Sequence, residues 1–384
     1  MRILFFLQFL GVSGVERQIF LLADHLARRG HHVSIAALHT LDPNWKWFWN
    51  PGSVKVQTFF LKTPKGVLSA GSQFIRATLK LRSLLKREDI QLVYTTHGAI
   101  SDFIAWLATR VRPDVKLIWS VRGSRRQPVL YRLDWKMALL SSLCRLVSTS
   151  VPLMISSSEV GYTNLKARGY RCQRSAVIYD GIDVEQFRPD SEARVRVRTE
   201  WTALKNEKLI GLVGRLDPVK GHSTFLKAAA LLAGERKDVR FFLVGDGPQT
   251  YRIELQRLSQ ELGLTERLIW TGARKDMPAV YNALDIVCSP SYSEGFNNVI
   301  GEAMACGVPC VVTDVGDPTK IVGDAGIVVP PGDPKMLAKG LRTMLQELHE
   351  MKPHQLREQI VSRFSAETMI ETTERIFMET CGSI

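Results

Sequence analysis

Two cations stand five positions apart in a short glycine-containing loop, where they suit the recognition of a phosphate group. The loop runs from Gly214 to Gly221 and carries Arg215 and Lys220. A guanidinium can bind two phosphate oxygens at once, and an ammonium near a helix start adds a compact charge. In the structural alternative, Arg215 pairs with Asp217 on a surface turn. The two interpretations are about equal when this loop is considered alone.

A second segment, residues 289–307, combines two carboxylates with small and amide-bearing residues. Glu294 precedes an expected helix and Glu302 lies within it. Carboxylates accept hydrogen bonds from hydroxyl groups, and the amides at a helix N-terminus attract phosphates. The segment therefore suits a polyhydroxylated ligand that carries phosphate. In the alternative, Glu294 only complements the helix dipole and Glu302 faces solvent.

Two weaker signals lie in the first half of the chain. The loop at residues 11–16 contains Gly11 and Gly14 just before an expected helix, so its backbone can approach an anion. His97 follows a short apolar run, and a lone histidine in that place is more often structural than catalytic.

Metal chemistry has no support in the sequence. The chain has no Asp-x-Asp, no Cys-x-x-Cys pair and no histidine cluster at metal-ligand spacing. We therefore expect no metal site and six reduced, mostly buried cysteines.

Short apolar runs alternate with stretches of helical period along both halves, which predicts an α/β fold with parallel sheets and right-handed crossovers. Helices are expected at 18–29 and 251–262 among others. The expected strands are 3–10, 33–38, 92–96, 115–120, 209–213, 240–244, 268–271, 286–289 and 310–313.

The chain divides into two domains near residue 190, because 384 residues exceed one ordinary core and a fresh strand begins at Leu209. We expect an N-terminal domain at 1–189 and a C-terminal domain at 190–363. The final helix, 364–384, could pack on either domain, and the N-terminal domain is the expected one. The apolar start of the chain predicts a buried strand, since it is too short to span a bilayer.

The formal charge of +13 is concentrated in the first half of the chain. Residues 1–189 carry 27 Lys and Arg against 12 Asp and Glu, which gives +15, whereas the remainder carries 24 against 26. Such asymmetry indicates an anionic partner, either phospholipid headgroups or nucleic acid. No motif for RNA or DNA recognition accompanies the charge, so we expect no nucleic acid. A merely soluble basic surface is the alternative.

One basic helix makes the membrane the favoured partner. Residues 73–87 mix six apolar positions with five cations, as in helices that lie in the headgroup plane. The apolar positions are Phe74, Ile75, Leu79, Leu81, Leu84 and Leu85, and an ordinary packed helix is the alternative. A second basic cluster that could flank an acceptor phosphate consists of Arg122, Arg125, Arg126, Arg132 and Lys136.

Taken in order, these motifs resemble the retaining glycosyltransferases of group 4, which have the GT-B fold. The resemblance covers essentially the whole chain. It rests on four motifs: Gly14-Val15-Glu16-Arg17; Gly181-Ile182-Asp183 followed by Phe187; Gly214-Arg215-Leu216 with Lys220-Gly221; and Glu294 to Glu302 ending in Gly307-Val308-Pro309.

The resemblance implies two Rossmann-like domains with a donor cleft between them, and a role for each matching residue. Arg215 and Lys220 would grip the donor diphosphate, Glu302 the donor ribose, and Glu294 and His97 would face the transferred sugar. The catalytic set it implies is His97, Arg215, Lys220 and Glu294. The remaining donor contacts would come from Gly14, Arg274, Gly295, Phe296, Asn297, Asn298 and Val299.

The implied function is transfer of a sugar from a nucleotide diphosphate donor, with UDP favoured, to a lipid-linked or polysaccharide acceptor. This would place the protein in cell-surface glycan synthesis, such as that of lipopolysaccharide, at the cytoplasmic face of a membrane and without any cofactor. The alternatives are a nucleotide-sugar epimerase and a non-catalytic protein of the same fold. Two departures from the group are Ser13, in place of a glycine, and Asp180, where asparagine is common.

Overall fold

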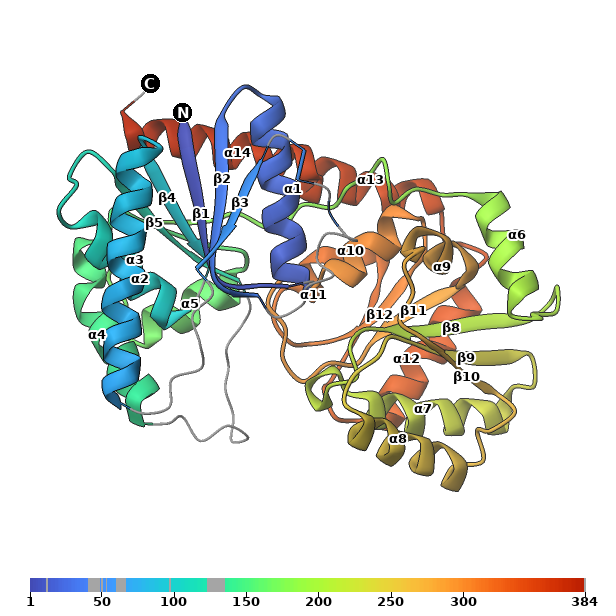
Figure 1. Ribbon diagram of the computed structural model, residues 1–384. Coiled ribbons are helices and arrows are strands. Elements are labelled where there is room, and N and C mark those ends of the chain that lie inside the picture. Colours follow the sequence, from blue (N-terminus) through green and yellow to red (C-terminus); the bar gives the residue numbers. More distant parts are fainter. Residues whose placement is uncertain are drawn as a thin grey trace. The chain divides into compact units, whose positions relative to one another are not determined.

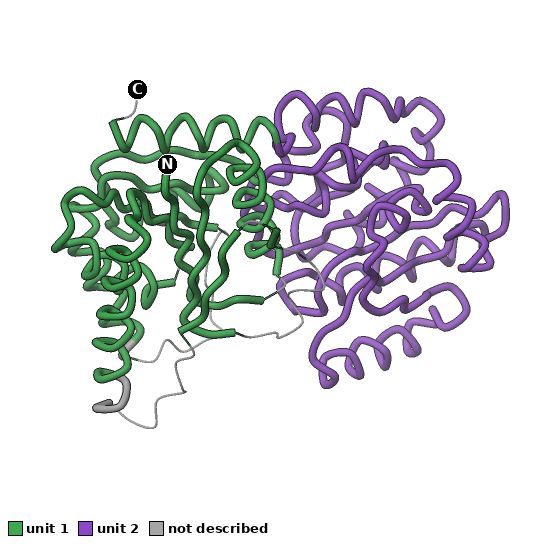
Figure 2. Tube along the Cα trace, turned by 45° about the horizontal axis from the view of Figure 1, so that its top comes forward, with its two compact units in different colours: residues 1–180, 367–384 green, residues 181–366 purple. Residues whose placement is uncertain are grey.

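A computed structural model of the chain describes residues 1–11, 13–40, 49, 51–52, 54–59, 67–96, 98–122 and 135–382, with the backbone alone at 67–70 and 136. These residues form two compact units (Figure 2). Unit 1 comprises Met1–Asp180 and Glu367–Ile384, and unit 2 comprises Gly181–Ala366. The expected sites at His97, Arg125, Arg126 and Arg132 lie outside the described residues.

Unit 1 is built around a parallel sheet of seven strands, in the order β3-β2-β1-β4-β5-β6-β7 (Figure 1). Its elements are β1 Arg2–Leu10, α1 Gly14–Arg28, β2 His32–Thr40, β3 Lys55–Thr58, α2 Val67–Arg87, β4 Leu92–Thr96, α3 Ala99–Thr109, β5 Lys116–Val121, α4 Trp135–Val147, η2 Ser148–Ser150, β6 Leu153–Ser156, α5 Glu159–Ala167, β7 Arg174–Val177 and α14 Ala366–Cys381.

Both faces of this sheet are covered, because successive side chains of β1 point to opposite sides. On one side, Phe6 contributes to a core that includes residues of α2, α3 and α4. On the other side, Phe5 packs on Tyr94, and Tyr94 packs on Phe377 of α14 with ring centroids 5.5 Å apart. The C-terminal helix thus completes the core of unit 1.

Unit 2 repeats the plan with a parallel sheet of six strands in the order β10-β9-β8-β11-β12-β13. Its elements are α6 Ser191–Glu200, β8 Lys208–Val213, η3 Pro218–Lys220, α7 His222–Glu235, β9 Val239–Val244, α8 Gln249–Glu261, β10 Leu268–Gly272, α9 Met277–Ala283, β11 Ile286–Ser289, α10 Asn298–Ala305, β12 Cys310–Thr313, α11 Pro318–Val322, η4 Gly323–Ala325, β13 Ile327–Val329, α12 Pro334–Glu347 and α13 Pro353–Phe364.

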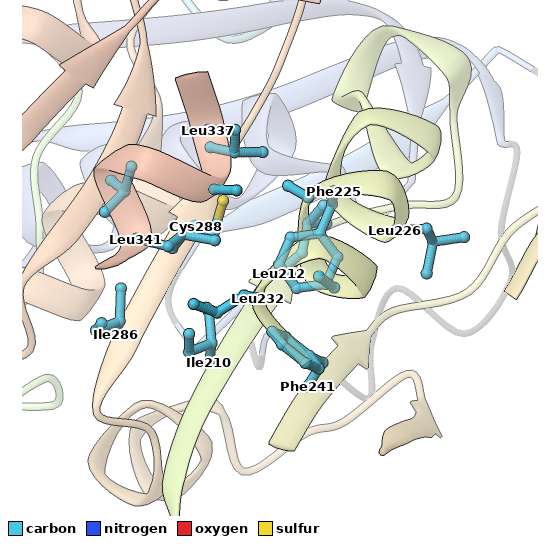
Figure 3. Close-up of a cluster of buried hydrophobic side chains, with 14 of the residues drawn as sticks. Ile210, Leu212, Phe225, Leu226, Leu232, Phe241, Ile286, Cys288, Leu337 and Leu341 are labelled. Atoms are coloured by element: carbon cyan, nitrogen blue, oxygen red, sulfur yellow. The ribbon is translucent and has the colours of Figure 1, made fainter. Parts of the chain in front are cut away.

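The core of unit 2 lies between its sheet and two of these helices. Figure 3 shows side chains of β8, β9 and β11 beside those of α7 and α12, among them Leu212, Phe225, Phe241 and Leu341. All six cysteines of the chain are unpaired, and four of them are buried. Burial raises the pKa of these buried thiols above the usual value.

The α/β fold and the parallel sheets are confirmed, and the nine expected strands all form. Four further strands, β3, β6, β7 and β13, were not expected from the sequence. Each is only three or four residues long, and three of them lie at the edges of the sheets, where polar residues are tolerated. Such runs carry too few apolar positions to stand out by periodicity.

The units divide after Asp180, somewhat before the expected boundary at 189–190. The intervening residues belong to unit 2 because their backbone is bonded there. Ile182 N donates to Phe364 O at 2.8 Å, and Arg357 of α13 donates to the carbonyls of Val184 and Phe187.

A buried ion pair joins the ends of two strands of unit 1. Arg122, after β5, bonds Asp180, and both side chains are less than 8% exposed. The same guanidinium donates to Tyr94 Oη at 3.3 Å, and that hydroxyl donates to Ser120 Oγ at 2.7 Å. The proposed role of Arg122 beside an acceptor phosphate is therefore wrong, because its charge is buried and neutralised within the unit.

Helix α2 is partly a core helix and partly exposed. Leu81, Leu84 and Leu85 are buried in the core of unit 1, whereas Ile75 and Leu79 are exposed. Arg82 is turned inward and donates to Leu107 O at 2.9 Å. Among the described residues, no helix has the length and hydropathy needed to cross a bilayer.

His222 is completely buried at the start of α7, with its ring 6.1 Å from that of Tyr251. Burial lowers the pKa of His222 to about 4, and the nearby charge of Lys220 acts in the same direction. The ring is therefore neutral at pH 7 in the folded protein.

We expect Asp180→Ala to reduce the free energy of unfolding of unit 1 by about 4 kcal/mol, because it leaves the Arg122 charge buried without its partner. The double variant Arg122→Met with Asp180→Leu should lose less. Thermal and urea unfolding followed by circular dichroism measure both. Asp114→Ala, which breaks an exposed Arg–Asp pair, is the control and should change little. Equal losses for Asp180→Ala and the control would contradict the prediction.

Since the folded pKa of His222 lies below that of an unfolded histidine, near 6.5, its contribution to stability is complete above pH 6.5 and is lost as the pH falls toward 4. The unfolding free energy should drop by about 2 kcal/mol more between pH 7 and pH 5 in wild type than in His222→Leu. Urea titrations at the two pH values measure this. The control His354→Asn changes an exposed histidine and should lose as much unfolding free energy between the two pH values as wild type does. If His222→Leu also loses as much as wild type, the His222 ring does not titrate in this way.

Candidate active site

Three loops of unit 2 meet at the carboxyl edge of its sheet, following β8, β11 and β12. Gly221, at φ +71°, lies so close to Pro290 that an added Cβ would stand 1.9 Å from the Pro290 carbonyl oxygen. Tyr292 N donates to Val219 O at 2.8 Å. At Gly316, an added Cβ would stand 2.2 Å from Glu294 O. Only glycine permits either contact, so both are built into the sequence.

Lys220 and Glu294, 74 residues apart in sequence, form an ion pair at this edge. Lys220 Nζ lies 2.7 Å from Glu294 Oε1, with the carboxylate largely buried. The same oxygen accepts from Ser291 Oγ at 2.6 Å and from Asn297 Nδ2 at 3.3 Å. The carboxylate is therefore held in one orientation by three donors, one of them charged.

Arg215 is exposed and paired within its own loop. Its Nη2 lies 2.6 Å from Asp217 Oδ2, which is the structural alternative considered for this residue. Burial alone would raise the pKa of Asp217, but the Val219 amide and the Arg215 guanidinium hold it below its usual value. Because the Arg215 side chain is two-thirds exposed, the pairing leaves its remaining donors open to a ligand.

Helix α10 begins directly after this carboxylate. Asn297, at the N-cap position, does not cap the helix with its side chain, which donates instead to Ser289 Oγ at 2.9 Å and to Glu294. Phe296 is buried and packs on Phe364, while Gly295 O accepts from Asp317 N. The backbone that enters α10 is thus held by the Asn297 side chain, the Phe296 ring and the Asp317 amide.

Glu302 is buried inside α10, so the solvent-facing alternative is wrong. Its Oε2 accepts from the hydroxyl of Tyr281, a fully buried residue of α9, at 2.6 Å. Sequence reasoning missed Tyr281, which belongs to no recognisable motif, and it gave no role to Ser291, although Ser291 lies within the segment 289–307. The signal for Tyr281 was a tyrosine in a short segment that is apolar apart from Asn282.

Arg274 follows β10, the outermost strand of the parallel sheet, and therefore also lies at its carboxyl edge. Its guanidinium pairs with Glu200 and with Asp276, and these partners raise its pKa above the usual value. The side chain is thereby committed to structure, which leaves only its backbone for the expected contact with a base.

The glycine loop of unit 1 starts α1 with a capping box. Ser13 Oγ accepts from Val15 N, and Glu16 Oε2 accepts from Ser13 N at 3.0 Å. The serine that departs from the usual glycine pair is thus the N-cap, which typically stabilises a helix by about 1 kcal/mol. Gly14 is the first residue of the helix.

Among residues in the described ranges, no group of three or more His, Cys, Asp or Glu side chains is arranged to hold a metal ion. The charged side chains described above in the loops after β8 and β11 include two cations, Arg215 and Lys220, and the carboxylates that pair with them, Asp217 and Glu294. This arrangement suits an anionic, hydroxyl-bearing ligand.

Profiles of two protein families match the chain, one in each half. The family described as Glycosyltransferase Family 4 matches residues 12–186, and that described as Glycosyl transferases group 1 matches residues 207–347. Together they contain every motif named above apart from Phe187, and they leave residues 1–11, 187–206 and 348–384 unmatched.

Two individual relatives that match parts of the chain have the same name. D-inositol 3-phosphate glycosyltransferase of Corynebacterium urealyticum is 29% identical over 283 residues, which are 65% of each chain. The enzyme of that name from Mycobacterium marinum is 38% identical over 149 residues, which are 37% of this chain and 30% of the relative. The chain thus spans less than two-thirds of the length of these relatives.

The fold has a close counterpart among solved structures. The Anabaena protein HepE, solved in complex with UDP, superposes with a TM-score of 0.83 at 22% identity, covering 99% of this chain and 100% of the other. The chain has the GT-B fold and belongs to the group 4 family of glycosyltransferases.

Proposed function

We propose that the protein transfers a sugar from a nucleotide diphosphate donor, with retention of the anomeric configuration. One observation carries this proposal: Lys220 and Glu294 are joined at 2.7 Å at the carboxyl edge of the unit 2 sheet, on the same loop system as the exposed Arg215. Ligands of open parallel sheets bind at that edge. Cations for a diphosphate and a carboxylate for sugar hydroxyls are therefore present together.

The chemical step requires charge stabilisation more than a covalent partner. Breaking the anomeric bond leaves negative charge on the departing diphosphate, which Arg215 and Lys220 would stabilise as preorganised cations. Front-face attack, in which the leaving phosphate accepts the proton of the acceptor, is our proposed route to retention. No residue is assigned as a nucleophile.

The other family positions receive matching roles in this proposal. Glu294 would face the transferred sugar and Glu302 the donor ribose, with Tyr281 orienting the Glu302 carboxylate. The peptide groups of 295–299, together with Gly14 and the backbone at Arg274, would complete the donor site. His97 remains the candidate beside the reacting sugar.

UDP is the proposed donor nucleotide, since the similar Anabaena protein was solved with UDP. The acceptor we propose is a lipid-linked or polysaccharide glycan at the cytoplasmic face of a membrane, as the charge of +15 in residues 1–189 favours an anionic surface. A second candidate acceptor is an inositol phosphate, which the names of the relatives favour. Its phosphate would suit the same basic half.

A panel of nucleotide sugars tests the donor, with release of free nucleotide diphosphate as the readout. Each donor is supplied with membrane extract, with inositol phosphate or with neither. Release that requires one acceptor identifies the acceptor class. A donor converted to an isomer without nucleotide release would indicate an epimerase, and no turnover of any donor would indicate a non-catalytic protein.

Arg215→Ala and Lys220→Ala should each reduce kcat by about a hundredfold or more, because each removes a cation that stabilises the leaving diphosphate. Both variants should stay folded, since the two side chains lie at a partly exposed edge. Steady-state kinetics at saturating donor, with circular dichroism, measure this.

Arg236→Ala is the matched control, because Arg236 pairs with Asp238 two positions on, in the same way that Arg215 pairs with Asp217. It lies outside the proposed site and should keep wild-type turnover. Near-wild-type kcat in Arg215→Ala or Lys220→Ala would contradict the role of these cations in stabilising the leaving diphosphate.

Activity should survive exhaustive chelation, because the proposed charge stabilisation comes from Arg215, Lys220 and helix amides. Assays after EDTA treatment and dialysis, compared with untreated enzyme, measure this. Complete loss of turnover that magnesium or manganese restores would contradict the metal-free mechanism.

A further inference from the structure

Helix α4 exposes a stripe of large apolar side chains along its length. Trp135, Leu139, Leu143 and Leu146 follow the helical spacing i, i+4, i+8 and i+11, and they are between 36% and 72% exposed. The opposite side of the helix, which includes Cys144, packs on the core of unit 1. The stripe is therefore not needed to hold the helix on its own unit.

Helix α2 adds to this apolar surface. Ile75 and Leu79, one turn apart, are 62% and 56% exposed. Helices α2 and α4 both pack against α3, so the three form one layer on the same side of the sheet (Figure 1). We call Ile75, Leu79, Trp135, Leu139, Leu143 and Leu146 the outer apolar face. A surface with so many large exposed apolar groups is typical of a docking site.

The charges on these helices all have one sign at the surface. The only acidic residue in α2, α3 and α4 is Asp102, which is buried and bonded to Thr95. The exposed cations are Arg76, Lys80, Lys86 and Arg87 on α2 and Arg145 on α4. The face is thus apolar and basic, which complements an anionic apolar partner.

An open groove continues the stripe at its far end. It has a volume of about 500 Å³ and is lined mainly by apolar atoms of Leu143, Leu146, Thr149 and Gly169, with Arg145 at its side. A lipid complements this groove, because its hydrocarbon segment suits the apolar lining and its anionic headgroup suits Arg145.

We propose that the outer apolar face docks on an anionic lipid bilayer, with the α4 stripe inserted at the boundary of headgroups and acyl chains. The inference rests on the proposed function in so far as the acceptor is at a membrane. Docking on a second copy of the chain is disfavoured by charge, because a two-fold contact would set the same cations against each other.

The test is cosedimentation of the full chain with vesicles of phosphatidylcholine alone or mixed with phosphatidylglycerol, at low and high salt. Wild type should bind the mixed vesicles, more weakly at high salt, and the neutral vesicles poorly. Trp135→Gln, Leu139→Gln and Leu146→Gln combined should weaken partition by about tenfold or more. The matched control changes Val195, Leu204 and Ile253 of unit 2, which are about as exposed, to Gln and should bind as wild type does.

Charge reversal tests the basic component separately. Arg76→Glu with Lys86→Glu should weaken binding to mixed vesicles and reduce its salt dependence. Neither side chain has a role in the core, and Arg82 is left unchanged because it bonds a carbonyl of α3.

Three results would overturn the proposal: no binding of wild type to the mixed vesicles, equal binding by the α4 variant, or a wild-type dimer that the α4 variant converts to monomer. Nucleotide release with a soluble acceptor, or by hydrolysis, is measured in parallel without vesicles. Loss of that activity with intact vesicle binding would refute the proposed function alone. Intact activity without vesicle binding would refute this inference alone.

Discussion

The close approach of the β8 and β11 loops is the constraint on which the candidate site of unit 2 depends. Gly221 allows the start of α7 to touch the backbone at Pro290, and this contact brings Lys220 within 2.7 Å of Glu294. A side chain at residue 221 would separate the loops and with them the ion pair. Once the pair is formed, Ser291 and Asn297 fix the carboxylate, and the backbone that enters α10 follows.

A different ion pair organises the carboxyl edge of the unit 1 sheet. Arg122 and Asp180 are both buried, and each neutralises the charge of the other. Either charge alone would be costly to bury. This explains why an aspartate stands where the family commonly has asparagine. Aspartate at this position gives the arginine at the end of β5 a charged partner, and Tyr94 and Ser120 extend the same network.

Helices α2 and α4, in the basic half of the chain, differ in how their apolar side chains are divided between the core and the surface. In α2, three leucines face the core and two large apolar side chains face outward, whereas α4 has apolar residues on both sides. Amphipathic period alone could not separate these cases, because it reports one face of a helix without saying what covers it. Exposure makes α4, in which the sequence analysis had noted only Lys136, the stronger candidate for contact with lipid.

The sequence by itself determined the fold class, nine strands and most of the family motifs, because apolar periodicity and glycine placement are local properties. It also placed Lys220, Glu294 and Glu302 at loops and helix starts of the right kind. Only the tertiary structure decided that Lys220 pairs with Glu294, that Glu302 is buried against Tyr281 and that Arg122 is neutralised by Asp180. Each of these pairs joins residues at least 21 positions apart, and such contacts are set by the order of strands in a sheet, which no local pattern encodes.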